Sequence, residues 1–167
     1  MKDEEWIGKI PINFDRKEDL IKSIQTFRLK EKFILDNDLN ERTLTHKLAE
    51  YIQENFPDFN VDCEYNRMRK GEDYLPKKLE LEQKEITHSN PSRVYPDVII
   101  HRRGDNQDNL LIIEVKKKEN PEGKEFDIQK IKEYISQTGY QFGVYLEFDN
   151  TDISEMEWYF TPDQINF

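Results

Sequence analysis

Two carboxylates and a lysine stand at the ends of two apolar runs in the chain. Asp97 precedes the run that begins at Val98, and Glu114 directly follows the run Leu110–Ile113, with Lys116 two residues later. Charged side chains beside buried strands are costly unless they are paired or bind a metal. Glu114 lies 17 residues after Asp97, with a Gly-Asp-Asn turn between them, so a hairpin would bring the three side chains together.

These residue types suit metal-dependent hydrolysis of a phosphodiester. Magnesium prefers hard oxygen ligands and keeps several of its waters, so two carboxylates and a substrate phosphate suffice as protein and substrate ligands. Glu114 and Lys116 are two residues apart and therefore share one face of a strand. The lysine adds a second cation where charge accumulates on the phosphate.

A second interpretation of the same residues requires no chemistry. Asp97 and Glu114 are expected near strand ends, where acids are common, and Lys116–Lys118 then form a solvated strand exit. Pro96 is explained as a local bend or bulge. Short motifs of this kind also arise by chance.

The pair Pro96-Asp97 and Glu114-Val115-Lys116 resembles the motif of the PD-(D/E)XK nuclease superfamily. The resemblance covers about residues 40–148. It implies that Asp97 and Glu114 hold Mg²⁺, for which Mn²⁺ would substitute, and that Lys116 positions or activates the attacking water. It also implies a restriction-endonuclease-like core of order αβββαβ.

Hydrophobic periodicity predicts an α/β fold with a mixed central sheet flanked by helices. The expected helices cover residues 15–35, 40–56 and 127–136, and the expected strands 59–65, 94–102, 110–116, 142–148 and 155–160. We expect one domain over residues 1–167, with an N-terminal helical extension (1–36), a core (37–148) and a C-terminal strand and tail (149–167). Residues 67–92 are predicted to be a long loop with a short helix near 79–85, and strand 110–116 is predicted to run parallel to strand 142–148.

Glu41 is a further candidate catalytic residue. It shares a helix face with Leu44, Leu48 and Ile52, which directs its carboxylate towards the sheet. By resemblance, related nucleases often carry an acid here that supports the metal or its water. The alternative is a favourable interaction of an acid in the first helical turn with the helix dipole.

The charge pattern bears on a nucleic-acid partner. The net charge is −10, but residues 119–167 alone carry −8. We expect the basic residues Arg102, Arg103, Lys117 and Lys118 to bind nucleic acid near the hydrolytic centre. Lys130 and Tyr134 match a Gln-x-x-x-Tyr motif of some superfamily branches except that Lys replaces Gln. They are therefore DNA-contact candidates, with Gln129 as a neighbouring alternative and ordinary solvation of Lys130 as another.

The other reactive side chains carry less information. Alternation over residues 59–65 predicts a buried core thiol at Cys63, and one cysteine excludes an internal disulfide. His46 and His101 are expected to be surface or strand histidines, and His88 falls in the long loop.

The sequence leads us to expect a cytoplasmic Mg²⁺-dependent nuclease with no membrane segment, acting on DNA. The acidic C-terminal third would also suit a nuclease-like module that does not cut. Such a module would bind a protein partner, form a homodimer or dock nucleic acid.

Overall fold

The computed structural model describes residues 1–37, 40–64, 67–70, 73–76, 95–105, 107–120 and 122–161. Its helices are α1 (Asp3–Gly8), α2 (Lys17–Lys30), α3 (Lys32–Asp36), α4 (Glu41–Asn55) and α5 (Lys124–Thr138). Its strands are β1 (Asn60–Cys63), β2 (Arg67–Lys70), β3 (Asp73–Pro76), β4 (Val98–His101), β5 (Leu111–Lys117), β6 (Phe142–Asp149) and β7 (Asp152–Phe160).

Five strands form one mixed sheet in the order β1-β4-β5-β6-β7. β5 and β6 are parallel and are connected through α5, whereas the β1–β4, β4–β5 and β6–β7 pairs are antiparallel. The predicted mixed α/β sheet, the hairpin and the parallel crossover are therefore confirmed. β2 and β3 pair separately as a two-stranded antiparallel sheet.

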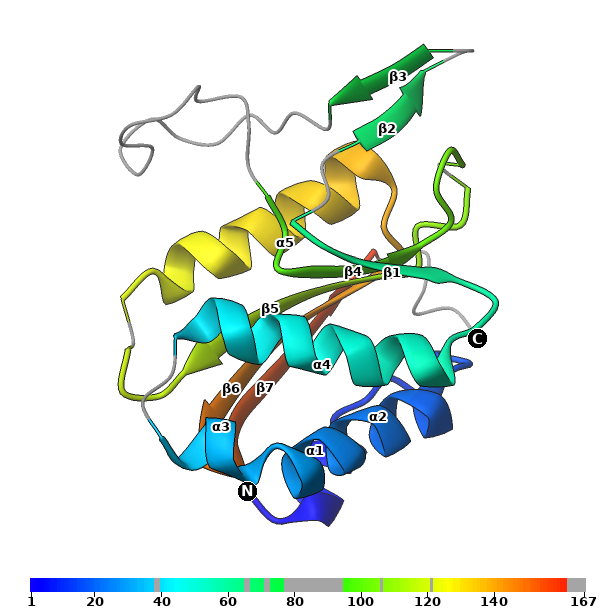
Figure 1. The fold of residues 1–167 in the computed structure, drawn as a ribbon. Helices are drawn as coiled ribbons and strands as arrows, with labels where there is room; N and C mark the ends of the chain where they lie inside the picture. The colour runs from blue at the N-terminus through cyan, green and yellow to red at the C-terminus, as the bar shows by residue number, and fades with distance from the viewer. Residues whose placement is uncertain are drawn as a thin grey trace.

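Helices cover both faces of the five-stranded sheet, with α5 on one side and α2 and α4 on the other (Figure 1). The side chains of β5 alternate accordingly. Ile113 and Val115 join the core beneath α2 and α4, while Ile112 packs with the α5 residues Ile131 and Tyr134. Glu114 and Lys116 therefore share the α5 face.

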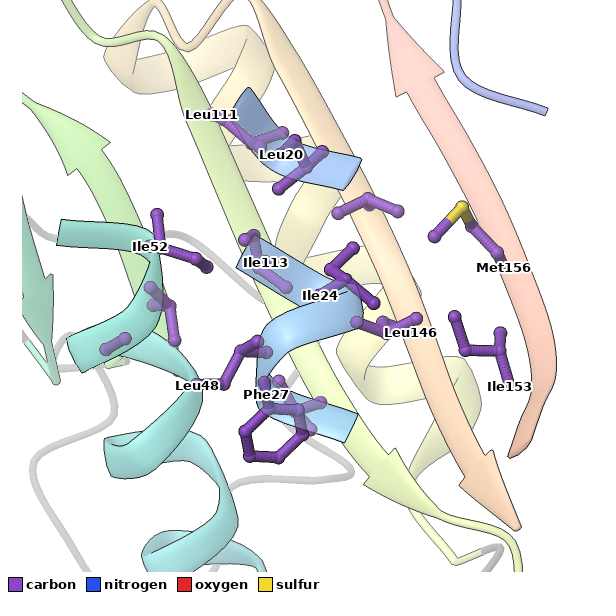
Figure 2. Close-up of a cluster of buried hydrophobic side chains, with 14 of the residues drawn as sticks. Leu20, Ile24, Phe27, Leu48, Ile52, Leu111, Ile113, Leu146, Ile153 and Met156 are labelled. Carbon is purple, nitrogen blue, oxygen red and sulfur yellow. The ribbon is translucent and has the colours of Figure 1, made fainter. Parts of the chain in front are cut away.

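The larger core lies between the sheet and the N-terminal helices, which contribute Leu20, Ile24 and Phe27 from α2 (Figure 2). They meet α4, β5, β6 and β7 through Leu48, Ile52, Leu111, Ile113, Leu146, Ile153 and Met156. Each of these side chains is buried, which contributes roughly 1.5–3 kcal/mol for a large apolar residue. The N-terminal helical segment is thus part of the same core as the sheet.

Two local features fix where α4 begins and how closely α5 packs on the sheet. The Asn40 side chain accepts a hydrogen bond from Thr43 N at 2.9 Å and so caps the start of α4. Gly143 in β6 lets α5 approach closely, because a Cβ there would lie 2.2 Å from Ile131 Cγ2. At the end of α5, Gly139 adopts the left-handed conformation (φ 73°) that commonly terminates a helix.

Several predicted boundaries need correction. The helix predicted over residues 15–35 is two helices interrupted at Glu31, and α1 was not predicted. The strand predicted from residue 94 begins at Val98, and the predicted loop contains β2 and β3. The short helix predicted near 79–85 lies outside the described residues, as does His88.

Candidate functional site

Asp97 and Glu114 meet where β4 begins and β5 ends. Their side chains are tied to each other's strand: Asp97 N donates to Glu114 Oε1 at 3.2 Å, and Val115 N donates to Asp97 Oδ2 at 2.9 Å. The last paired residues of the ladder are Val98 and Ile113, so these two bonds continue the strand connection by one step through side chains. The hairpin thus brings both predicted metal ligands together.

Glu114 is fully buried, and its second oxygen faces a lysine. Oε2 lies 2.8 Å from Lys130 Nζ. Burial raises the pKa of the Glu114 carboxyl well above its ordinary value, and the nearby charge of Asp97 adds to the increase, while Lys130 opposes it. A proton or a cation is therefore favoured at this carboxylate.

Lys130 is an internal cation, which corrects its predicted placement as a nucleic-acid contact. The residue is 6% exposed, and its Nζ donates to Tyr95 O at 3.2 Å and lies 3.6 Å from Asp127 Oδ1. Burial alone would lower the pKa of this ammonium group. The charges of Glu114, Asp97 and Asp127 outweigh burial, so the pKa is raised and Lys130 stays protonated.

Tyr134 is also inside the molecule rather than on a binding surface. Its ring is fully buried and packs edge-on against Tyr140, with centroids 5.8 Å apart. Burial raises the pKa of its hydroxyl, and the charge of Glu114 adds to this. Tyr134 is therefore a core residue, and its predicted contact with nucleic acid is not supported.

Lys116 is placed by two acids, of which the sequence analysis identified one. Its Nζ lies 3.2 Å from Asp127 Oδ2 and 3.9 Å from Glu41 Oε1. Asp127 was missed, although it precedes Lys130 by three residues on α5, a spacing that places two side chains on one helix face. Asp127 thus bridges Lys116 and Lys130.

Glu41 reaches the same site from the first turn of α4, on the helix face expected. Its Oε2 accepts a hydrogen bond from Lys117 N at 2.9 Å, and its Oε1 accepts one from Asn120 Nδ2 at 3.4 Å. These bonds connect α4 to the end of β5. The starts of α4 and α5 lie beside the C-terminal end of β5, at one end of the sheet strands (Figure 1).

A cleft of about 560 Å³ opens at this end of the sheet. It is lined by Glu41, Arg42, Thr43, Thr45, His46, Lys47, Cys63, Glu64, Asp97, Val115, Lys116 and Asp127. Glu114 is not among the lining residues, so its carboxylate lies behind the cleft wall. Asp97, Glu41, Asp127 and Lys116 are the charged groups that combine access with proximity to it.

The charge and donor set of this site fit a hard divalent cation. Four carboxylates (Glu41, Asp97, Glu114 and Asp127) accompany two ammonium groups (Lys116 and Lys130), which leaves a formal charge of −2 when all six groups are ionised. Oxygen ligands with retained waters are the coordination that Mg²⁺ prefers. Over the described ranges, no three His, Cys, Asp or Glu side chains are already grouped as a metal cage.

The four basic residues predicted to form one nucleic-acid surface do not lie together. Arg102 and Arg103 follow β4, whereas Lys117 and Lys118 end and follow β5, and antiparallel pairing puts these points at opposite ends of the hairpin. Each has an acidic neighbour. The ion pairs are Arg102–Asp108 (2.7 Å), Arg103–Asp62, Lys117–Glu119 (3.0 Å) and Lys118–Asp149 (3.0 Å).

Two other sequence expectations change in detail. His101 is a strand histidine, as expected, but it is buried and its Nε2 lies 2.8 Å from Asp62 Oδ2. Burial opposes ionisation of Asp62, yet His101 and Arg103 lower its pKa to about 2. Cys63 is half-buried at the cleft rather than a buried core thiol, and burial together with Asp97 raises its pKa to about 11.

Comparison with known proteins adds no relative: no family model, curated protein or solved structure matches this chain. Across the described residues, no helix is long and apolar enough to cross a membrane.

Proposed function

We propose that this protein is a Mg²⁺-dependent nuclease with a restriction-endonuclease-like core, and that DNA is its substrate. The observation that carries the proposal is the convergence of Asp97, Lys116 and Glu41 at one cleft, with Glu114 bonded to Asp97 N directly behind its wall. The order α4, β1, β4, β5, α5, β6 supports it, because it is the αβββαβ order of that fold with β2 and β3 inserted. β7 lies outside this core and extends the sheet next to β6.

Asp97 and Glu114 are the residues that would hold Mg²⁺. Asp97 lines the cleft and uses Oδ2 for Val115 N, so its other oxygen is the first protein ligand available from the cleft. Glu114 would be the second ligand, through Oε2, the oxygen that lies 2.8 Å from Lys130 Nζ. Bound Mg²⁺ would supply a water of lowered pKa and would offset charge on the phosphate.

The remaining groups orient the reaction. Lys116, held between Asp127 and Glu41, presents its ammonium group to the cleft, where it can stabilise a phosphate oxygen that gains charge. Glu41 can accept a hydrogen bond from the attacking water, because its carboxylate lies within reach of the same space. Asp127 acts as a positioning residue for Lys116.

The direct test is cleavage of DNA by the purified protein. We expect cleavage with Mg²⁺ or Mn²⁺ and none with EDTA, and loss of cleavage in Asp97→Asn, Glu114→Gln and Lys116→Met. Asparagine and glutamine keep an acceptor for the strand-connecting hydrogen bonds, so the loss reports on charge. Cleavage that survives Asp97→Asn would show that another site or another protein is responsible.

One observation favours a second candidate, a nuclease-like module that binds a protein partner or nucleic acid without cutting. Lys130 lies 2.8 Å from Glu114 Oε2, so the most buried carboxylate of the site has a cationic partner without a metal. This module would bind no Mn²⁺ in calorimetry and would cleave no nucleic acid. Mn²⁺ binding that is lost in Asp97→Asn would exclude it.

A further inference from the structure

We propose that the first two turns of α4 form the phosphate-binding wall of the cleft, through Arg42, His46 and Lys47. The ligand is the phosphate backbone of a nucleic acid. This inference rests on the proposed function and names the surface that positions its substrate. It moves the nucleic-acid contact from Arg102 and Arg103 to a part of the chain that sequence analysis did not select.

Acids and basic groups are unevenly distributed over the cleft, and among the basic groups lies one further acid, Glu64, which pairs with Arg42. Asp97, Asp127 and Glu41 line the cleft at the sheet and at the starts of the two helices, whereas Arg42, His46 and Lys47 line it from α4. Arg42 and His46 are four positions apart and lie on one side of the helix. Lys47 is four positions after Thr43, which also lines the cleft, so it reaches the cleft from the adjacent side of α4. A polyanion can approach the acids only if cations beside them offset the repulsion.

The basic groups on this wall are accessible. The Arg42 side chain is 79% exposed, that of His46 is 66% exposed and that of Lys47 is 37% exposed. Arg42 pairs with Glu64 at 2.9 Å, and His46 and Lys47 both pair with Glu50, at 3.2 and 3.0 Å. Exposed ion pairs contribute little stability, so these partners can be exchanged for phosphates at small cost.

The surface expected from the sequence, Arg102, Arg103, Lys117 and Lys118, does not combine accessible basic groups with a place at the cleft. Arg103 is 56% exposed, but it pairs with Asp62, a 13% exposed acid that also contacts the buried His101, so exchange of this partner for a phosphate would disturb the β1–β4 pair. Arg102 donates to Asp58 O at 3.2 Å and lies over the Phe59 ring, and the cleft-lining residues include neither arginine. Lys117 is buried.

The test measures binding without cleavage, in an Asp97→Asn background with Ca²⁺ present. The probe is a fluorescent duplex DNA, with a single strand of the same sequence as a second probe, followed by anisotropy over a range of salt. Three double variants each remove two positive charges: Arg42→Ala/Lys47→Ala, Arg102→Ala/Arg103→Ala, and Lys9→Ala/Lys22→Ala. The last pair is exposed on α1–α2 and does not line the cleft, so it controls for net charge.

We expect the Arg42/Lys47 variant to bind at least tenfold more weakly and to lose about 1.4–1.8 from the slope of log K against log salt, which corresponds to two phosphate contacts. The Lys9/Lys22 variant should keep the slope of the Asp97→Asn parent. Arg42→Lys/Lys47→Arg should restore both quantities, which a purely structural defect would not allow. Melting curves of each variant establish that it is folded.

The outcomes separate this inference from the proposed function. If the parent binds DNA but the Arg42/Lys47 variant binds equally well, the α4 wall is wrong while the nuclease proposal stands. If the Arg102/Arg103 variant alone loses the slope, the originally expected surface is restored and this one is rejected. Displacement of DNA by polyglutamate at equal charge concentration would show a general polyanion site and would overturn the assignment, and a parent that binds no nucleic acid would overturn both proposals.

Discussion

The ion pair between Glu114 and Lys130 is the residue-level feature on which the state of the site depends. Both side chains are buried, at 0% and 8% exposure, and Asp97 and Asp127 surround them with further negative charge. A buried ion pair contributes little net stability, but removing one partner leaves a charge that neither water nor protein neutralises. The two residues should therefore be strongly coupled.

Lys130→Met should destabilise the metal-free protein by about 3–5 kcal/mol at neutral pH. The pKa of Glu114 is already raised, and without Lys130 it rises further. A group whose folded pKa is raised stabilises below its unfolded value, here 4.5, and this stabilisation is lost as pH rises through the folded pKa. The deficit should therefore be small at pH 4 and grow towards pH 8, as measured by urea unfolding at several pH values.

Adding Glu114→Gln to Lys130→Met should recover most of the lost stability, because the uncompensated carboxylate is removed. The coupling energy from the four-variant cycle should reach about 1–3 kcal/mol. Glu114→Gln alone should melt close to wild type without metal, since Lys130 keeps Asp127 and Tyr95 O as partners. Additive effects of the two changes would show that the pair is not coupled in solution.

At the level of elements, the alternation and spacing of apolar residues were enough to predict most of the sheet. The hairpin, the crossover helix and the last strand follow from alternation and helical spacing, which depend on local burial. Antiparallel pairing of β4 and β5 also separates Arg102 and Arg103 from Lys117 and Lys118. Counting charges along the sequence misses this separation, because the count ignores the directions in which the two strands run. Asp127 and the depth of Lys130 depend on how closely α5 approaches the sheet, which periodicity does not specify.

Gly143→Ala tests that close approach. A Cβ at this position would lie 2.2 Å from Ile131 Cγ2 and 3.2 Å from Ile112 Cγ2, so α5 must move away from β6. We expect destabilisation of roughly 1–3 kcal/mol and reduced DNA cleavage, because α5 carries Asp127 and Lys130. Gly8→Ala is the matched control, since no atom lies within 4 Å of its added Cβ. Equal unfolding free energies for the two variants would mean that α5 packs more loosely than described.

At the scale of the whole molecule, charge is unevenly arranged around a continuous core. The chain carries a net charge of −10, and two of the uncompensated negative charges lie at the site itself. The N-terminal helices pack in the same core as β5 and β6, which carry Glu114, Lys116 and their neighbours. Binding at the cleft should therefore be coupled to global unfolding.

Millimolar Mn²⁺ or Mg²⁺ should raise the melting temperature of the whole protein. A ligand bound only by the folded state adds about 2.7 kcal/mol at a hundredfold excess over Kd. Asp97→Asn and Glu114→Gln should show little or no increase, since each lacks one negative oxygen ligand. Differential scanning calorimetry with and without Mn²⁺ gives the comparison, and an equal increase in all three proteins would place the metal elsewhere.

The hydrogen bonds that join β4 and β5 through Asp97 and Glu114 affect which site residues would be retained during evolution. Asp97 accepts from Val115 N, and Glu114 accepts from Asp97 N while it neutralises Lys130, so both acids serve the folded chain before any substrate arrives. Under the proposed function, a lineage that abandoned hydrolysis would still be selected to keep them. Lys116 pairs with the acids Asp127 and Glu41, but among its described contacts its side chain joins no two strands. Drift at the position of Lys116, rather than at the two acids, would therefore be the first trace of a descendant that had stopped cutting.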